Sequence, residues 1–158
     1  MEQSQIFKTK FIEKFSEYNI KESIEDDCLE IEIINYEDNN IIIHFDENEI
    51  IFFFLEYHMH IYYYDDSFQY LVDITKKVLS SEYVVMVVYS NKRWLCSNLL
   101  KFEDVPMNSL SKFLKFCFPN TKEFRNELKN GGKVYFSFWD SSKNMIYKVQ
   151  DGKLSCEK

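Results

Sequence analysis

The sequence predicts an α+β fold: one globular domain, residues 1–158, with a mostly antiparallel sheet of about seven strands and three to four helices packed on it. Three observations support this prediction. Hydrophobic residues recur every three to four positions in some segments and every second position in others. Short polar turns join the segments that have the two-residue period. The chain has only three Gly and two Pro, so no segment resembles an interdomain linker.

The first half predicts a helix followed by a meander of strands. An opening helix over residues 7–18 places four aromatic residues on one face: Phe7, Phe11, Phe15 and Tyr18. From Cys28 the apolar period becomes two, which predicts three strands, at residues 28–33, 41–45 and 50–60. The connecting turns lie at residues 37–40 and 46–49. Because these connections are short, the strands should pair antiparallel.

The second half predicts three further helices and two hairpins. A helix over residues 67–79 follows several candidate N-caps. Asn108 or Ser109 should cap a third helix that Pro119 stops, and a short helix over 121–129 ends before two glycines. The hairpin strands are expected at residues 83–89 and 93–100, and at 133–139 and 145–149. The apolar run at 83–89 should be a central strand covered on both faces.

Acidic residues are concentrated in one part of the chain. The formal net charge is −7, but residues 22–75 contain no Lys or Arg. Their fifteen acids are Glu22, Glu25, Asp26, Asp27, Glu30, Glu32, Glu37, Asp38, Asp46, Glu47, Glu49, Glu56, Asp65, Asp66 and Asp73. Such a field repels nucleic acid and anionic membranes and attracts basic partners, although a merely solvated surface is the alternative. We therefore expect neither nucleic acid nor membrane as a partner.

The basic residues of the second half do not form a recognised phosphate-binding pattern. Six of them fall on predicted helices or at a strand start: Lys112, Lys115, Lys122, Arg125, Lys129 and Lys133. No glycine-rich phosphate loop accompanies them, so a solvated face is the expectation.

A site for a metal ion or another small ligand is the main alternative to a protein-binding surface. Glu56, His58 and His60 would project from one face of a strand over 50–60, with His44 on the neighbouring strand as a fourth ligand. The same residues also suit an interface strand in which imidazoles bond to tyrosines or carboxylates. We expect no cofactor.

Nothing in the sequence predicts catalysis or export. The four cysteines form no CxxC pair, and no local motif activates a nucleophile, so we expect no enzyme. The N-terminus lacks the features of a signal peptide, and no apolar run is long enough to cross a membrane. These observations favour a cytoplasmic protein.

One stretch of the chain resembles a pattern found in small bacterial immunity proteins. It comprises residues 52–60 (FFFLEYHMH), the acidic turn at Tyr64-Asp65-Asp66, the following helix, and residues 83–94. Such proteins protect cells from polymorphic toxins, including those of contact-dependent growth inhibition. The resemblance covers roughly residues 41–95 and rests on a His-x-His strand before an acidic turn and a helix.

The resemblance implies that an acidic face caps a toxin domain, often a cationic nuclease. Carboxylates would take the place of substrate phosphates, and tyrosines would supply rigid apolar contacts. The residues expected to bind the toxin are Glu30, Glu32, Asp46, Glu47, Glu49, Tyr62, Tyr63, Tyr64, Asp65 and Asp66.

Overall fold

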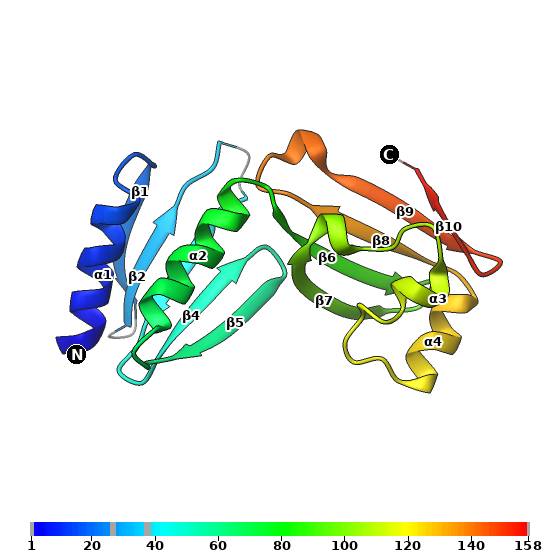
Figure 1. Ribbon diagram of the computed structural model, residues 1–158, viewed down its shortest axis with the longest axis horizontal. Coiled ribbons are helices and arrows are strands. Elements are labelled where there is room, and N and C mark those ends of the chain that lie inside the picture. Colours follow the sequence, from blue (N-terminus) through cyan, green and yellow to red (C-terminus); the bar gives the residue numbers. More distant parts are fainter. Residues whose placement is uncertain (1, 26–27, 37–38, 158) are drawn as a thin grey trace. The chain divides into compact units, whose positions relative to one another are not determined.

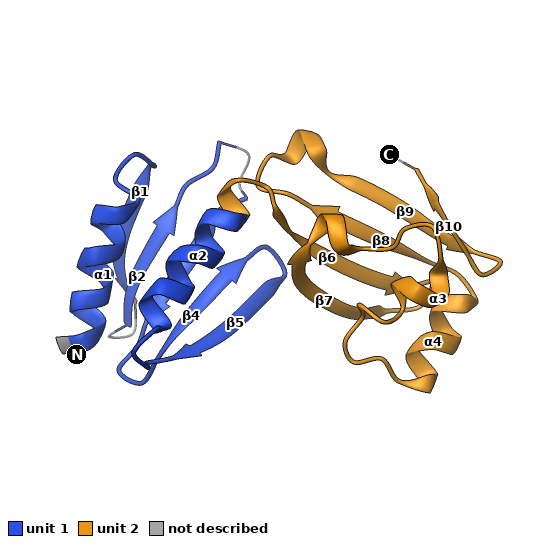
Figure 2. Ribbon diagram, in the orientation of Figure 1, with its two compact units in different colours: residues 1–77 blue, residues 78–158 orange. Residues whose placement is uncertain are grey.

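The computed structural model describes residues 2–25, 28–36 and 39–157. It divides into two compact units, Met1–Lys77 and Val78–Lys158 (Figure 2). Each unit contains a five-stranded sheet in which all neighbouring strands are antiparallel. No helix in the described part of the chain is both long and apolar enough to cross a membrane.

The predicted α+β class is confirmed, and the described residues form four α-helices. The predicted number of about seven strands in one sheet is wrong, because the described residues form ten strands in two sheets. The expectation of a single domain over residues 1–158 stays a prediction.

The first unit is an antiparallel meander with two helices on one face. Its elements are α1 (Glu2–Lys14), β1 (Ile20–Glu25), β2 (Cys28–Ile33), β3 (Ile41–Phe45), β4 (Glu49–Phe54), β5 (Tyr57–Tyr62) and α2 (Ser67–Leu79), whose last two residues belong to the second unit. The strands are ordered β1-β2-β3-β4-β5. Figure 1 shows α1 and α2 lying across the same face of this sheet.

The core of the first unit forms because alternate strand residues turn toward the helices. The strand residues buried on that side are Ile31, Ile33, Ile41, Ile43, Phe45, Ile50, Phe52, Phe54 and Ile61. From α1, Phe11 and Phe15 are buried against them, and Phe7 packs edge-on against Phe68 of α2. The opening helix is Glu2–Lys14 and not 7–18, because the aromatic spacing identifies a helix face but does not mark the helix ends.

Two strand boundaries in the first unit differ from the predictions. The expected strand over 50–60 is two strands, β4 and β5, joined by a tight turn at Leu55, whose φ is +53°. Leucine rarely adopts a positive φ, so the apolar run gave no sign of a turn. Strand β1 was missed because its polar residues hide the alternation. The expected turn at 37–40 falls partly on Glu37 and Asp38, which lie outside the described residues.

The second unit is a sheet of order β10-β9-β8-β6-β7 with two short helices. Its elements are β6 (Tyr83–Ser90), β7 (Trp94–Lys101), the 3₁₀ helix η1 (Phe102–Asp104), α3 (Leu110–Phe113), α4 (Lys122–Lys129), β8 (Gly132–Ser137), the 3₁₀ helix η2 (Ser141–Lys143), β9 (Met145–Gln150) and β10 (Lys153–Cys156). The expected central strand is confirmed as β6, which pairs with β7 and β8 and is buried from Val84 to Val88.

Helix α3 begins after one of its two predicted caps, and Thr121, expected as the first residue of the next helix, is instead its N-cap. Ser109 caps α3 by accepting a hydrogen bond from the Lys112 N–H, and Thr121 caps α4 by accepting one from the Phe124 N–H. Helix α3 has only four residues, fewer than predicted. Both helices pack on the core of this unit through the buried side chains of Phe113, Phe124 and Leu128.

Candidate functional site

The most distinctive surface of the first unit is the side of its sheet that faces away from α1 and α2. We call it the open face, and its described residues are Lys21, Ser23, Glu30, Glu32, Ile42, His44, Glu49, Ile51, Phe53, His58, His60 and Tyr62. The strand register places them in cross-strand rows, such as Glu30–His44–Ile51–His60. The local alternation of the strands therefore creates a surface with both apolar and charged groups.

Each of the three glutamates on the open face accepts hydrogen bonds from neighbouring side chains. Glu30 accepts from His44 Nε2 at 2.8 Å and from Ser23 Oγ at 2.8 Å. Glu49 accepts from His60 Nδ1 at 2.9 Å. Glu32 accepts from Asn40 Nδ2 at 2.7 Å. These carboxylates are thus held in place while remaining partly exposed, with side-chain exposures of 17% to 21%.

The centre of the open face is apolar and aromatic. Ile42, Ile51 and Phe53 are partly buried there. The Phe53 ring lies between two imidazoles, with its centroid 4.9 Å from that of His44 and 5.8 Å from that of His58. This group of rings and aliphatic side chains is bordered by the three glutamates, an arrangement of apolar centre and polar rim that is typical of protein interfaces.

One end of the sheet carries further acids. Strands β3 and β5 run in the same direction, so the β3–β4 turn and the β5–α2 connection lie at the same end. A hydrogen bond of 2.9 Å from the Tyr63 hydroxyl to the Asp46 carbonyl joins them. We call this region the acidic end, and its members are Asp46, Glu47, Tyr64, Asp65 and Asp66. All five side chains are exposed.

The three predicted tyrosines have different surroundings. Tyr62 and Tyr64 are exposed, at 55% and 69%. Tyr63 instead packs edge-on against Phe7 and donates to Asp46. Burial, together with the nearby Asp46 charge, raises the pKa of Tyr63 to about 12. Tyr62 and Tyr64 are therefore available for contact with a partner. Tyr63 instead has a structural role, because its hydroxyl holds the backbone at Asp46.

The negative charge at this end of the sheet acts on a neighbouring thiol. The pKa of Cys28 is raised, first by burial and then by the charges of Asp46 and Glu30. The fraction of Cys28 present as thiolate therefore depends on the charges of Asp46 and Glu30.

Charge divides between the two units. Met1–Lys77 carries 18 acidic and 6 basic residues, and Val78–Lys158 carries 8 acidic and 13 basic residues, so their formal charges are −12 and +5. Four acids of the first unit, Asp26, Asp27, Glu37 and Asp38, lie outside the described residues, and the side chain of Glu25 is likewise not described.

The residues expected for a metal site are not on one strand. Glu56 lies in the β4–β5 turn, whereas His58 and His60 lie on the open face with ring centroids 5.6 Å apart. His44 and His60 are hydrogen-bonded to Glu30 and Glu49. Within residues 2–25, 28–36 and 39–157, no three His, Cys, Asp or Glu side chains are arranged to hold a metal ion.

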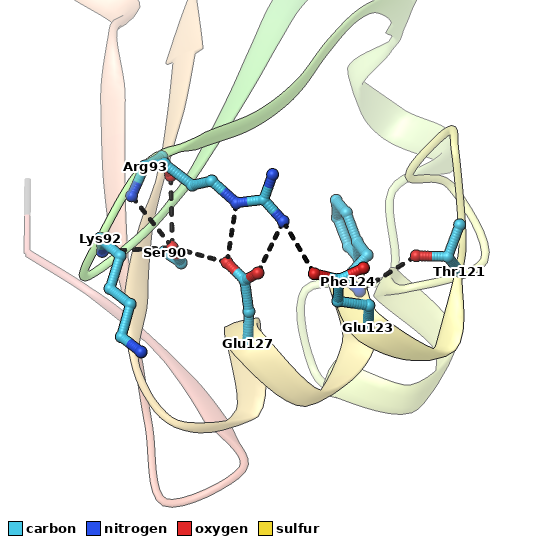
Figure 3. A network of polar contacts seen from close by, with 7 residues as sticks. All are labelled: Ser90, Lys92, Arg93, Thr121, Glu123, Phe124 and Glu127. Carbon is cyan, nitrogen blue, oxygen red and sulfur yellow. Dashed lines mark hydrogen bonds and ion pairs between the residues drawn. The ribbon is translucent and has the colours of Figure 1, made fainter.

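A separate polar network lies in the second unit (Figure 3). Glu127 of α4 accepts two hydrogen bonds from Arg93, one from Nε at 3.2 Å and one from Nη2 at 2.6 Å. Ser90 Oγ also lies 3.2 Å from Glu127 and accepts hydrogen bonds from the backbone N–H groups of Lys92 and Arg93. The network ties α4 to the β6–β7 hairpin, which is a structural role.

Sequence reasoning identified the carboxylates of the site but missed its apolar centre and the partners of the glutamates. Ile42, Ile51 and Phe53 were assigned only to strands, because strand register decides which residues lie side by side. Comparisons with protein-family models, curated proteins and solved structures find no match for this chain.

Proposed function

We propose that this protein is an immunity protein that binds a cationic bacterial toxin domain through the open face and the acidic end. The observation that carries the proposal is the open face itself: an apolar centre bordered by three glutamates that are already held by hydrogen bonds. The protein acts by occupying the toxin surface, without catalysis and without a cofactor. Its site of action is the cytoplasm, where the toxin would reach its target.

The geometry supports a protein ligand. Rings and aliphatic side chains at the centre of an interface supply most of its binding free energy, and surrounding polar groups exclude water. Phe53 and Tyr62 are the ring anchors of this surface, with Tyr64 beside them at the acidic end. A carboxylate that is already fixed loses little side-chain entropy when it pairs with a Lys or Arg of the partner.

The size of the open face indicates that a partner must reach the acidic end as well. Four strand spacings of about 4.8 Å and strands about 18 Å long give a footprint on the order of 350 Å². A standard interface covers roughly 800 Å² on each partner. Contacts to Asp46, Glu47, Asp65 and Asp66 would supply much of the remainder.

The charge of the first unit supports a basic partner. A formal charge of −12 over Met1–Lys77 accelerates association with a cationic surface and suppresses binding to anionic ones. If the toxin is a nuclease, carboxylates of this protein would occupy the positions of substrate phosphates and block access to the toxin's active site.

The test is co-expression with the toxin domain encoded beside this gene, with growth as the readout. Wild-type protein should restore growth. Phe53→Asp should abolish rescue, because it places a charge in the apolar centre of the interface. Trp94→Asp is the matched control, since Trp94 is a ring exposed by 52% on the sheet of the second unit, and it should leave rescue intact.

Circular dichroism must show that both variants fold. A neighbouring domain that is harmless alone, or equal rescue by wild type and Phe53→Asp, would contradict the proposal.

A further inference from the structure

The acidic and the basic side chains of helix α4 lie on different sides of the helix. Phe124 and Leu128 are buried in the core of the second unit. Glu123 and Glu127 are the only acids of the helix, and both are engaged by Arg93 (Figure 3). The basic side chains are left on another side of the helix.

Those basic side chains line a concave pocket. Lys122, Arg125 and Lys129 of α4 border a cavity of about 480 Å³ together with Lys115, which follows α3. All eight lining residues are neutral or basic, and the neutral ones include Ser111 and Asn120. The sequence led us to expect a solvated face for these four cations, but the fold gathers them around one hollow of a size that suits a small ligand.

The four cations have no acidic partner within 4.0 Å in the part of the chain that the structure describes. Elsewhere in the same unit, Lys101, Lys133 and Lys143 each form an ion pair. Like charges three or four positions apart on a helix repel each other, as Lys122, Arg125 and Lys129 do here. A bound anion would remove this repulsion.

A second observation concerns Asn120. Its side-chain oxygen is buried and has no hydrogen-bond partner among the described residues. An unsatisfied buried acceptor is unfavourable, typically by about 1–3 kcal/mol. Asn120 also lines the pocket, so its side chain adds a polar group beside the four cations.

We propose that this pocket binds a small polyphosphorylated molecule, with the phosphate chain on Lys115, Lys122, Arg125 and Lys129. The polar groups of Ser111 and Asn120 would contact the remainder of the ligand. This site is on the second unit and does not depend on the proposed toxin-binding surface.

The test is isothermal titration of the full chain with inorganic tripolyphosphate and with ATP, without magnesium and at low ionic strength. Both should bind with a stoichiometry of one. Lys122→Ala/Arg125→Ala should weaken binding at least about tenfold, since two of four charge-assisted contacts are lost. Lys112→Ala is the matched control, because Lys112 is an exposed cation of α3 outside the pocket, and it should bind within about twofold of wild type.

The two probes separate the parts of the ligand. Tighter binding of ATP than of tripolyphosphate would show that the pocket also contacts the nucleoside, and equal affinities would show that the phosphate chain supplies the whole interaction. No detectable binding of either probe at millimolar concentration would overturn the proposal. Equal losses in Lys112→Ala and in the double variant would also overturn it, because they would show non-specific attraction to the basic unit.

Discussion

At the scale of single residues, the glutamates of the open face differ from ordinary surface carboxylates. Glu30, Glu32 and Glu49 each accept a hydrogen bond from a neighbouring His or Asn side chain. A free surface glutamate loses rotamer freedom when it binds a partner, whereas these three have already lost most of it on folding. Their fixed positions make them suitable to select a partner by the placement of its cations.

The pKa of the Cys28 thiol responds in part to the negative charge near these groups. Burial raises the pKa of Cys28, and the charges of Asp46 and Glu30 raise it further. We predict that Asp46→Asn lowers this pKa and speeds the reaction of Cys28 with a disulfide reagent several-fold at pH 8, because only the thiolate reacts.

The measurement uses a Cys156→Ser background, since Cys156 is exposed, and identifies the labelled cysteine by mass spectrometry. Glu47→Gln is the control. Glu47 is adjacent to Asp46 but is not among the groups that shift the Cys28 pKa. In Glu47→Gln, Cys28 should therefore react at the same rate as in the background protein. An unchanged rate in Asp46→Asn would show that the acidic end does not act on Cys28.

At the scale of secondary-structure elements, α4 is held to the β6–β7 hairpin by the contact between Arg93 and Glu127. The hydrogen bond from Arg93, followed by its charge, lowers the pKa of Glu127, although its burial acts in the opposite direction. A carboxyl group whose pKa is lower in the folded state stabilises the fold above its unfolded pKa. That contribution is lost as the pH falls through the folded pKa.

We therefore predict that Glu127→Gln lowers the urea midpoint of unfolding at pH 7, and that the difference from wild type shrinks toward pH 3. Unfolding curves at both pH values measure this. Glu123→Gln should have a smaller effect, because Glu123 lies 3.4 Å from Arg93 and its side chain is exposed by 78%. A difference that stays constant between pH 7 and pH 3 would exclude the charge of Glu127 as its cause.

Some elements could be predicted because their local signals agree. Helix α2 has its predicted bounds of 67–79, and the strands at 28–33 and 41–45 also match, because each has a clear apolar period. Strand β1 was missed because four of its six residues are polar, and β10 was missed because it has only four residues. The β4–β5 turn was missed because Leu55 adopts a conformation that its residue type disfavours.

Of the candidate site, only the acidic residues could be predicted from the sequence. Acidic residues between 22 and 75 stand out in the sequence without knowledge of the fold. The apolar centre and the histidine partners depend on strand register, which brings together residues that are distant in the sequence: Glu30 and His44 are 14 positions apart, and Glu49 and His60 are 11 apart. No local pattern contains that information.

At the scale of the whole molecule, the two units have opposite formal charge, −12 and +5. This division agrees with the two ligands that we propose, a cationic protein for the first unit and a polyphosphorylated molecule for the second. Salt should weaken both interactions, but variants of one surface should leave the other unchanged, because the two sets of residues do not overlap.

The most direct test of the central proposal is the dissociation constant of the purified complex with the toxin domain, measured at low and high salt. The double variant Glu30→Lys/Glu49→Lys should bind at least about a hundredfold more weakly than wild type at low salt, and its affinity should depend less steeply on salt. Asp104→Lys, a charge reversal at an exposed position of the second unit, should bind as wild type does. Equal affinity of the double variant and wild type, or a wild-type complex indifferent to salt, would contradict an acidic open face as the binding surface.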